Sequence, residues 1–416
     1  MSVSDQVNHL FRQESGKMVA VLTRIFGINQ LELVQDVVQD TMIKALQEWE
    51  KSLPDNHVAW MYRVARNRAI DLIRRNNKST EFSADLAPLL KSEYSLSYTV
   101  NQLFHSDEIQ DSQLRMIFTI CHPELNEASQ IAFTLKYLGG LSVRQIASAF
   151  LVNEETIQKR IYRARQKFAQ KDIPLEVPGG FTLLQRLDNA LKVIYLMFNE
   201  GYHSSHPDQL IIRDICLEAM RLTKILSEYP PTANNKTFSL LALMCFHVAR
   251  FEARVQDGEM ILLPDQDRSL WNQELISKGN DFLDRALVQP VISSYFMEAS
   301  IMAVHCNTAS YAATNWHLIY QLYQKLHDLK PSPLVKLHQL VALSELKGPQ
   351  CALQELEHLE GLEDYYLYHA IKGSLLVKSG CVSLARQSWH QAYELAKTES
   401  ERQLIRKKLQ VLAGEI

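Results

Sequence analysis

The sequence predicts an all-α protein. Glycine and proline, which interrupt regular structure, number only 14 and 13 among 416 residues. Leu, Ala, Gln, Glu and Lys, which favour helices, are abundant. Apolar residues recur at helical spacing along most of the chain, and no segment of useful length alternates as a strand would. Because the chain is too long for one ordinary domain, two or three helical domains are expected.

Composition limits the classes of protein to which the chain can belong. The formal net charge is only -3, so any nucleic-acid surface must come from local clusters of basic residues. The six cysteines form no CxxC pair, which indicates neither a zinc nor a disulfide framework. The N-terminus lacks a signal-peptide core, and no apolar run reaches the roughly 18 residues that span a bilayer. We therefore expect a cytoplasmic protein with no membrane segment and no cofactor.

Breaker residues and polar stretches divide the chain into four segments. Residues 1–77 form a first helical domain. The polar, Ser-rich stretch 78–105 is expected to be a linker that contains at most a short helix. A second helical domain covers residues 106–172 and ends at a Pro- and Gly-rich break. Residues 173–416 form a larger domain of successive helices.

The first domain contains a basic segment, WMYRVARNRAIDLIRRNNK, at residues 60–78. Apolar residues at helical spacing give it one face that can pack, while arginines on its flanks can neutralise phosphates. Trp60 and Tyr62 add aromatic rings suited to stacking on unpaired bases. The alternative is a solvated amphipathic helix with Trp60 in the core, and for this helix in isolation that alternative is preferred.

The second domain contains LSVRQIASAFLVNEETIQKRIYRARQKF, residues 141–168, which predicts a helix-turn-helix. Ser142 can cap a short helix that ends near Ala149, and residues 150–152 would make the turn. Asn153 can cap the second helix, which carries two glutamates in its positive first turn. The agreement of both caps, the apolar turn and the basic cluster favours DNA binding over an ordinary helical hairpin. Side chains that can reach base edges or phosphates are those of Arg144, Glu155, Thr156, Gln158, Lys159, Arg160 and Arg163.

In this order and spacing, the two basic segments resemble those of extracytoplasmic-function sigma factors of bacterial RNA polymerase. LVQDVVQDTMIKALQEW looks like the polymerase-binding part of sigma region two, and NHVAWMYRVARNRAIDLIRR looks like its promoter-opening helix. Residues 138–168 look like region four, which is a helix-turn-helix. The resemblance covers about residues 5–171, and the combination is more specific than a lone helix-turn-helix. It implies core RNA polymerase and promoter DNA as partners, and no catalysed reaction.

The resemblance implies roles for residues of the first domain. Asp36, Gln39 and Asp40 would share a helix surface that docks on the clamp helices of the largest polymerase subunit. A solvated helix face is the alternative. Contacts to the minus-ten promoter element are implied for Asn56, His57, Trp60, Arg63, Arg66, Asn67, Arg74 and Arg75. In relatives, the loop at Asn56 captures a flipped base, and a cationic surround must offset the cost of unstacking it. The second domain would read the minus-thirty-five element.

The last domain narrows the resemblance to a sigma-factor subgroup with a large C-terminal tetratricopeptide-like extension. LKVIYLMFNEGYHSS, QDRSLW and the SPLVKL turn carry this resemblance, whereas VISSYFMEASIMAVH departs from the version with glycine and glutamine that is typical of the subgroup. Gly373, Gly380, Ala385, Trp389 and Ala392 fall near the small and large positions of such a repeat. Helical repeats bind protein segments, so the extension is expected to modulate activity, with a protein regulator as a candidate partner.

FNEGYHSSHPD is the most polar insertion between apolar stretches of this last domain. Asn199, Glu200 and Tyr202 are candidate contacts for a partner, or members of an internal hydrogen-bonded network. A metal site that adds His203 and His206 to Glu200 is disfavoured, because glycine and proline interrupt the helix there.

Two alternatives to a sigma factor stay open. A helix-turn-helix regulator acting without sigma activity would bind duplex DNA without polymerase, but it does not need a promoter-opening helix. An enzyme in the C-terminal domain is disfavoured, because no nucleophile triad, phosphate loop or convincing metal set is seen there. In DQDRSLW, a helix cap with a charge pair to Arg268 is expected before any functional contact.

Overall fold

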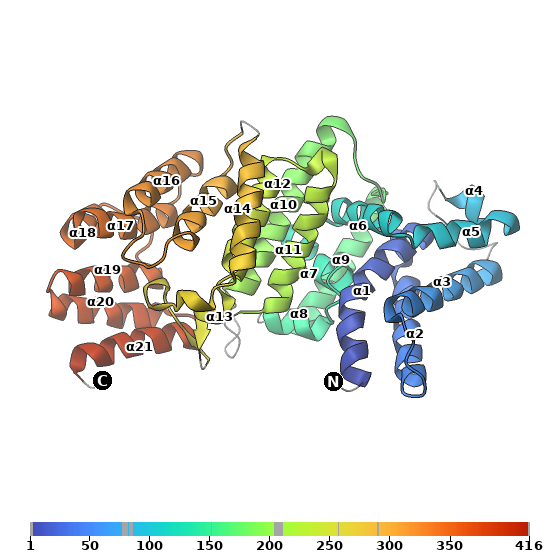
Figure 1. The fold of residues 1–416 in the computed structure, drawn as a ribbon, viewed down its shortest axis with the longest axis horizontal. Coiled ribbons are helices and arrows are strands. Elements are labelled where there is room, and N and C mark those ends of the chain that lie inside the picture. The colour runs from blue at the N-terminus through green and yellow to red at the C-terminus, as the bar shows by residue number, and fades with distance from the viewer. Residues whose placement is uncertain are drawn as a thin grey trace. The chain divides into compact units, whose positions relative to one another are not determined.

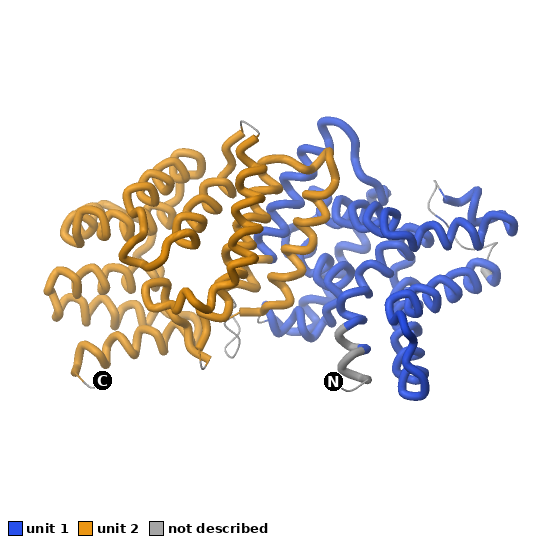
Figure 2. The backbone as a smooth tube through the Cα atoms, viewed as in Figure 1, with its two compact units in different colours: residues 1–197 blue, residues 198–416 orange. Residues whose placement is uncertain are grey.

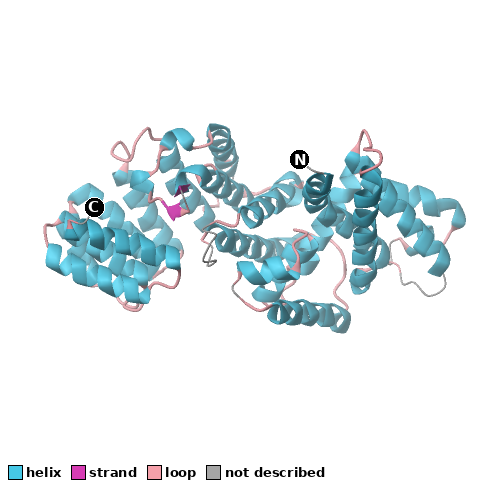
Figure 3. Ribbon diagram, turned by 90° about the horizontal axis from the view of Figure 1, so that it is seen from below, coloured by secondary structure: helices cyan, strands magenta, loops and turns pink. Residues whose placement is uncertain are grey.

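The computed structural model describes residues 3–76, 82, 86–150, 152–203, 211–256, 258–288 and 291–414. These residues are almost entirely helical, which confirms the predicted fold class (Figures 1 and 3). Packing divides the chain into two compact units, residues 1–197 and residues 198–416 (Figure 2). No helix in the described ranges combines the length and apolarity needed to cross a membrane.

Unit 1 contains the helices of both predicted N-terminal domains. The first group of helices is α1 (Val3–Phe26), η1 (Ile28–Gln30), α2 (Leu31–Trp49) and α3 (His57–Asn76). The second group is α4 (Ala87–Leu90), α5 (Glu93–Leu103), α6 (Ser106–Ile120), α7 (Glu127–Tyr137), α8 (Val143–Ala149), α9 (Glu154–Lys171) and the first part of α10 (Gly180–Tyr202).

The stretch predicted as a linker is partly helical and packed. Residues 77–81 and 83–85 lie outside the described residues, but α5 covers 93–103. Leu96, Val100 and Leu103 of α5 are buried. Their i, i+4, i+7 spacing is that of one helix face, which is why this segment packs instead of running free.

The predicted boundary at residue 173 differs from the division by packing, which falls between residues 197 and 198, inside α10. The first part of α10 packs on the end of α6. Asn189 Nδ2 donates to the carbonyl oxygen of Cys121 at 2.5 Å, and Arg186 donates to that of Phe118 at 3.2 Å. The last carbonyls of a helix have no partner within it, so α10 supplies the donors that the end of α6 lacks.

Within unit 1, α1 lies directly against the end of α7. A Cβ atom added to Gly16 would lie 1.9 Å from the carbonyl oxygen of Leu138, so only glycine permits this approach. Further along α1, the buried Arg24 pairs with Glu108 at 2.6 Å and with Asp111 at 3.0 Å, both on α6. This close backbone approach and this ion-pair cluster both hold the two predicted domains of unit 1 together.

Unit 2 is a succession of helices with one small hairpin. Its first elements are the last residues of α10, then α11 (Arg213–Glu228), η2 (Pro230–Thr232), α12 (Asn235–Val248), α13 (Phe251–Arg254), β1 (Val255–Gln256), β2 (Glu259–Met260), η3 (Leu263–Asp265) and η4 (Arg268–Leu270). The later helices are α14 (Gln273–Leu287), α15 (Ser294–Cys306), α16 (Trp316–Leu329), α17 (Pro333–Lys347), α18 (Pro349–Leu356), α19 (Tyr366–Lys378), α20 (Val382–Leu395) and α21 (Glu399–Ala413).

The centre of unit 2 is α12, which is buried nearly all round. A helix that is apolar on every face must be covered on every face, and here α11, α14 and α15 cover it. The crossing with α14 is close: a Cβ atom added to Gly279 would lie 2.6 Å from the ring of Phe246. Beyond α12, β1 and β2 form an antiparallel pair with Val255 opposite Met260. The sequence predicts no strand here, because strands of two residues are too short to show an alternating pattern.

The end of unit 2 brings together the residues expected at repeat positions. Gly373 on α19 faces Trp389 on α20, and a Cβ atom at Gly373 would lie 2.3 Å from the indole ring. Ala385 and Ala392 of α20 are fully buried, and Trp389 is 5% exposed. Gly380 lies between the two helices with a φ of +79°, a conformation that favours glycine. A tetratricopeptide-like repeat stays a prediction for this region. The small residues that such a repeat requires are packed at the predicted positions.

The DQDRSLW segment has the predicted cap but not the predicted charge pair. Asp267 accepts a hydrogen bond from the backbone N–H of Ser269 at 2.9 Å. Arg268 instead donates to the carbonyl oxygens of His305 at 2.6 Å and Thr308 at 2.5 Å, and its guanidinium lies over the ring of Trp271. The reason is that the end of α15 presents carbonyls without helical partners, which bind a cation well.

Alanine at Gly16 is expected to destabilise unit 1. Alanine usually stabilises a helix relative to glycine, but here its Cβ atom would collide with the backbone of Leu138. Overpacking of this kind costs about 1–3 kcal/mol, so urea denaturation of the full chain should show an earlier transition for Gly16→Ala. Gly179→Ala is the matched control, because a Cβ atom there meets nothing within 4 Å. Equal shifts for both variants would contradict the proposed close approach.

Acid is expected to destabilise unit 2 through His305. Burial first, and then the charges of Arg250 and Arg268, lower the pKa of this imidazole from 6.5 to about 3. The unfolded chain takes up this proton near pH 6.5 and the folded chain only near pH 3, so the free energy of unfolding falls as pH is lowered between them. His305→Gln, which cannot ionise, should make that decline shallower in urea titrations at several pH values.

His390→Gln is the control for the titration, because His390 is exposed. It should leave the pH dependence of unfolding as it is in the unaltered chain. A decline of the same slope in the His305→Gln variant would show that His305 takes no part in the acid sensitivity.

Candidate nucleic-acid interface

The helix-turn-helix of unit 1 is built as predicted. Ser142 and Gln145 form a reciprocal cap at the start of α8, with hydrogen bonds of 3.1 and 2.8 Å. Asn153 accepts from the backbone N–H of Thr156 at 2.8 Å and so caps α9. Leu151, in the predicted turn, lies outside the described residues. The caps fix where α9 begins, and therefore which of its side chains point outward.

Burial of one face of α9 turns its basic residues toward solvent. Ile157, Ile161 and Ala164 are no more than 6% exposed. Among the predicted contacts, Arg144, Glu155, Gln158, Lys159 and Arg163 are exposed, and Thr156 and Arg160 are half-buried. The structure thus places all of these predicted side chains on α8 or α9.

Some of these side chains are already engaged within the helix. The hydroxyl of Thr156 donates to Asn153 at 2.6 Å, so it belongs to the cap. Lys159 pairs with Glu155 one turn earlier at 2.7 Å, although both remain exposed. Arg163 lines a shallow groove between α9 and the start of α7.

Two residues of α9 have side-chain positions that its sequence did not predict. Arg165, one of the basic residues of the helix, turns toward α2 and pairs with Glu32 at 2.7 Å. Tyr162 was not among the predicted contacts, yet 60% of it is exposed on the outer side of the helix. An aromatic residue between two basic positions on a polar face was the signal that could have identified it.

The start of α3 is held by a cap and an aromatic cluster. Asn56 accepts from the backbone N–H of Ala59 at 2.9 Å, so its side chain caps the helix. The ring of His57 lies edge-on to Trp49, 4.9 Å between centroids, and Trp60 also contacts Trp49 at 5.5 Å. Trp60 is only 9% exposed, as in the core alternative, and it supports this cluster instead of offering a free ring face.

Beyond this cluster, α3 carries a basic outer face. Arg63, Asn67, Arg74 and Arg75 are exposed and Arg66 is half-buried. The four arginines have long, charged side chains, and a row of them along one helix can neutralise successive phosphates. Unit 1 therefore has two basic helices, α3 and α9, each packed through its apolar face.

The predicted polymerase-binding residues share one turn of α2. Asp36 and Gln39 are exposed, whereas Asp40 is half-buried and pairs with Arg68 of α3 at 3.2 Å. This pair joins α2 to α3, so Asp40 has a structural contact in addition to its place on the surface.

The candidate contacts at the end of α10 are mostly internal. Tyr202 is 2% exposed, and the guanidinium of Arg254 lies 4.0 Å from its ring centre. Asn199 and Glu200 are half-buried, and burial raises the pKa of the Glu200 carboxyl. His206 lies outside the described residues, and the residues that are described contain no cluster of three or more potential metal ligands. For Tyr202 the arrangement favours internal packing over partner contact.

Three segments of the chain match known families. Residues 10–79, which include α2 and α3, match sigma-70 region 2. Residues 115–168, which include α8 and most of α9, match sigma-70 region 4. Residues 186–287 match a family of unknown function, DUF6596. The two basic helices therefore fall one in each sigma-70 region.

Curated relatives are similar to the chain over different lengths. An uncharacterized protein of Rhizobium meliloti (strain 1021) is 36% identical over 402 residues, covering 95% of this chain and 93% of that protein. The ECF RNA polymerase sigma-E factor of Haemophilus influenzae (strain ATCC 51907 / DSM 11121 / KW20 / Rd) is 29% identical over 171 residues, covering 40% of this chain and 88% of that protein. The ECF RNA polymerase sigma-E factor of Escherichia coli (strain K12) is 28% identical over 144 residues, covering 34% of this chain and 75% of that protein. No solved structure matches.

Removing basic side chains from α9 is expected to weaken binding to duplex DNA. Arg160→Ala and Arg163→Ala should each cost about 1–3 kcal/mol if the side chain reads a base edge, and should lower the salt dependence if it contacts a phosphate. Fluorescence anisotropy at fixed salt, with a duplex selected from a random pool, measures both effects. The control is Lys192→Ala on α10, whose side chain pairs with Glu127. Unchanged affinity for both arginine variants would mean that α9 does not face DNA.

Proposed function

This chain belongs to the extracytoplasmic-function sigma factors and carries a large C-terminal extension, and from that membership we propose how its parts divide the work. A sigma factor acts in transcription initiation, with core RNA polymerase and promoter DNA as its partners. The observation that carries the proposal is the pair of basic helices, α3 and α9, with one in each sigma-70 region.

The outer face of α3 contacts the minus-ten element. Arg63, Arg74 and Arg75 are exposed, and no carboxylate among the described residues forms an ion pair with them, so they are available to phosphates. Asn56 and His57 lie at the start of the helix, where the positive end of its dipole favours the DNA backbone. Trp49 and Trp60 support His57 from behind.

The helix-turn-helix reads the minus-thirty-five element through α9. Gln158 and Arg163 are exposed on its outer face, and Arg160 lies between them at the surface. Gln and Arg are the side chains that make paired hydrogen bonds to adenine and guanine in the major groove. Arg144 and Lys159 contribute charge for the phosphates.

The exposed turn of α2 that carries Asp36, Gln39 and Asp40 docks on core polymerase. Two of the three side chains, Asp36 and Gln39, are exposed, which supports a surface role. The Asp40–Arg68 pair supports the same role by fixing α2 against α3. Polymerase docking at α2 and DNA contact at α3 would then act through one rigid helical pair.

Unit 1 opens when it binds a promoter. B-form DNA rises about 3.4 Å per base pair, so two elements about 25 base pairs apart are separated by roughly 85 Å. A compact unit of about 200 residues has a radius of gyration of about 16 Å. The packed form cannot reach both elements, and the pairs Arg24–Glu108 and Arg165–Glu32 must therefore break.

The extension modulates activity by protein contact and carries out no reaction of its own. Successive packed helix pairs, such as α19 with α20, support a repeat-like surface for a protein regulator. The alternative is a helix-turn-helix regulator without sigma activity. It does not account for the helices that match sigma-70 region 2.

The proposal is tested by run-off transcription with core polymerase. We expect promoter-specific transcripts from the full-length chain and from a truncation after Met197, which keeps the packing of α10 on α6. A truncation after Lys171 removes Asn189 and Arg186, and it should be less stable in thermal unfolding. The ratio of full-length to truncated activity measures what the extension does.

Each outcome of this experiment has a distinct meaning. Absence of any promoter-specific transcript from the full chain and from both truncations would overturn the division of labour. Duplex binding without transcription would favour the regulator alternative. Equal transcription with and without the extension would remove its modulating role on core polymerase alone.

A further inference from the structure

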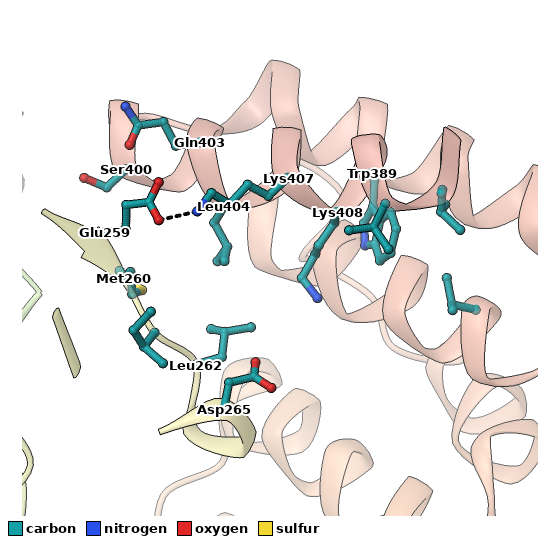
Figure 4. A pocket seen from close by; sticks show the side chains of 14 residues that line it. Glu259, Met260, Leu262, Asp265, Trp389, Ser400, Gln403, Leu404, Lys407 and Lys408 are labelled. Atoms are coloured by element: carbon teal, nitrogen blue, oxygen red, sulfur yellow. Dashed lines mark hydrogen bonds and ion pairs between the residues drawn. The ribbon is translucent and has the colours of Figure 1, made fainter. Parts of the chain in front are cut away.

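Unit 2 contains a partly enclosed apolar cavity between the β1–β2 hairpin and α21 (Figure 4). Its volume is about 360 Å³. This lies at the lower end of the range of about 300–1,000 Å³ that is typical of small-molecule sites. The apolar wall is formed by Met260, Leu262, Val377, Trp389, Leu404 and Leu412. None of the DNA or polymerase contacts described above includes these residues.

Two adjacent lysines of α21 have different environments at this cavity. Lys407 pairs with Glu259 of β2 at the rim, so its charge is already balanced. Lys408 reaches into the cavity (Figure 4), and its ammonium lies 5.2 Å from the ring centre of Trp389. No carboxylate of the described residues lies within ion-pairing distance of Lys408. The cavity therefore presents one ammonium group that forms no ion pair with the described residues, with the carboxylate of Asp265 on the facing wall.

The surroundings of Lys408 favour an anion at its ammonium. Burial lowers the pKa of Lys408, Asp265 raises it, and Lys378 lowers it. A charged group that is taken out of water is stabilised when an opposite charge is placed beside it. A bound anion would supply such a charge at ion-pairing distance, whereas Asp265 lies on the opposite wall (Figure 4).

The wall beside Lys408 is held in place before any ligand arrives. The indole N–H of Trp389 donates to the carbonyl oxygen of Ala370 at 3.1 Å. The ring packs directly on Gly373, where even a Cβ atom would lie 2.3 Å from it, so it cannot move toward α19. A wall that needs no reordering loses little entropy on binding, which favours a small ligand.

We propose that this cavity binds a small monocarboxylic acid with an apolar body, its carboxylate at Lys408 and its body against Trp389, Leu404 and Leu262. A single lysine balances a single negative charge. The carboxylate of Asp265 on the opposite wall repels every added negative charge, so phosphates and dicarboxylates are disfavoured more than a monocarboxylate. A peptide terminus would bring amide groups against the apolar wall, where amide groups left without hydrogen bonds cost free energy.

The proposal is tested with three probes that share one apolar chain: decanoate, decanol and decyltrimethylammonium. Isothermal titration of the full-length chain should show saturable binding of one decanoate, weaker binding of decanol and none of the cation. In Lys408→Met, which keeps the apolar stem, decanoate affinity should fall by about tenfold or more, the loss expected for one charge-assisted hydrogen bond. Decanol affinity should be unchanged.

Lys397→Met is the matched control, because Lys397 is exposed and does not line the cavity. It should bind all three probes as the unaltered chain does. Leu404→Trp, which fills the cavity, should abolish binding of both decanoate and decanol. Circular dichroism checks that each variant is folded, and titrations use only folded variants.

Any of three results would overturn the proposal. The first is no saturable decanoate binding up to millimolar concentration, and the second is equal decanoate affinity in Lys408→Met. The third is a hexapeptide with an apolar C-terminal residue that binds more tightly than decanoate and competes with it. Because no polymerase or DNA is present in the titration, its outcome is independent of the transcription test.

Discussion

Burial of one apolar face on each basic helix is the interaction on which the two basic surfaces of unit 1 depend. Ile157, Ile161 and Ala164 hold α9 against its neighbours, and that contact alone determines that Gln158 and Arg163 point outward. The same holds for α3, where Met61 and Ala65 are buried. Since a helix repeats every 3.6 residues, fixing the inner face fixes the direction of every other side chain.

Ion pairs inside unit 1 then decide which charges remain available. In the packed form, Arg165 pairs with Glu32 and Arg68 pairs with Asp40, although both arginines belong to basic helices. Arg24 joins the two halves of the unit through Glu108 in the packed form. A count of basic residues would therefore overstate the cationic surface, because some arginines hold the fold together and only the rest meet solvent.

In unit 2, Trp271 and Trp389 lie where helices meet, and each contacts several neighbouring elements. Trp271 lies beneath the guanidinium groups of Arg250 and Arg268, and these connect the segment after α12 with the end of α15. Trp389 fills the contact between α19 and α20 and at the same time forms a wall of the cavity beside Lys408. The indole ring of Trp389 fits only because Gly373 lies opposite it. The same ring therefore determines both the packing of α19 on α20 and the shape of the cavity wall.

The sequence by itself determined the helical class, both caps of the helix-turn-helix and the two basic helices, because these depend on residues a few positions apart. Ser142, Asn153 and the apolar spacing of α9 are local signals of this kind. Only the tertiary structure decided that Trp60 is buried, that Arg165 turns to Glu32, that Arg268 binds carbonyls and that Lys408 faces a cavity. Each of these outcomes depends on a partner more than ten residues away, and neither helical periodicity nor capping preference carries information over that distance.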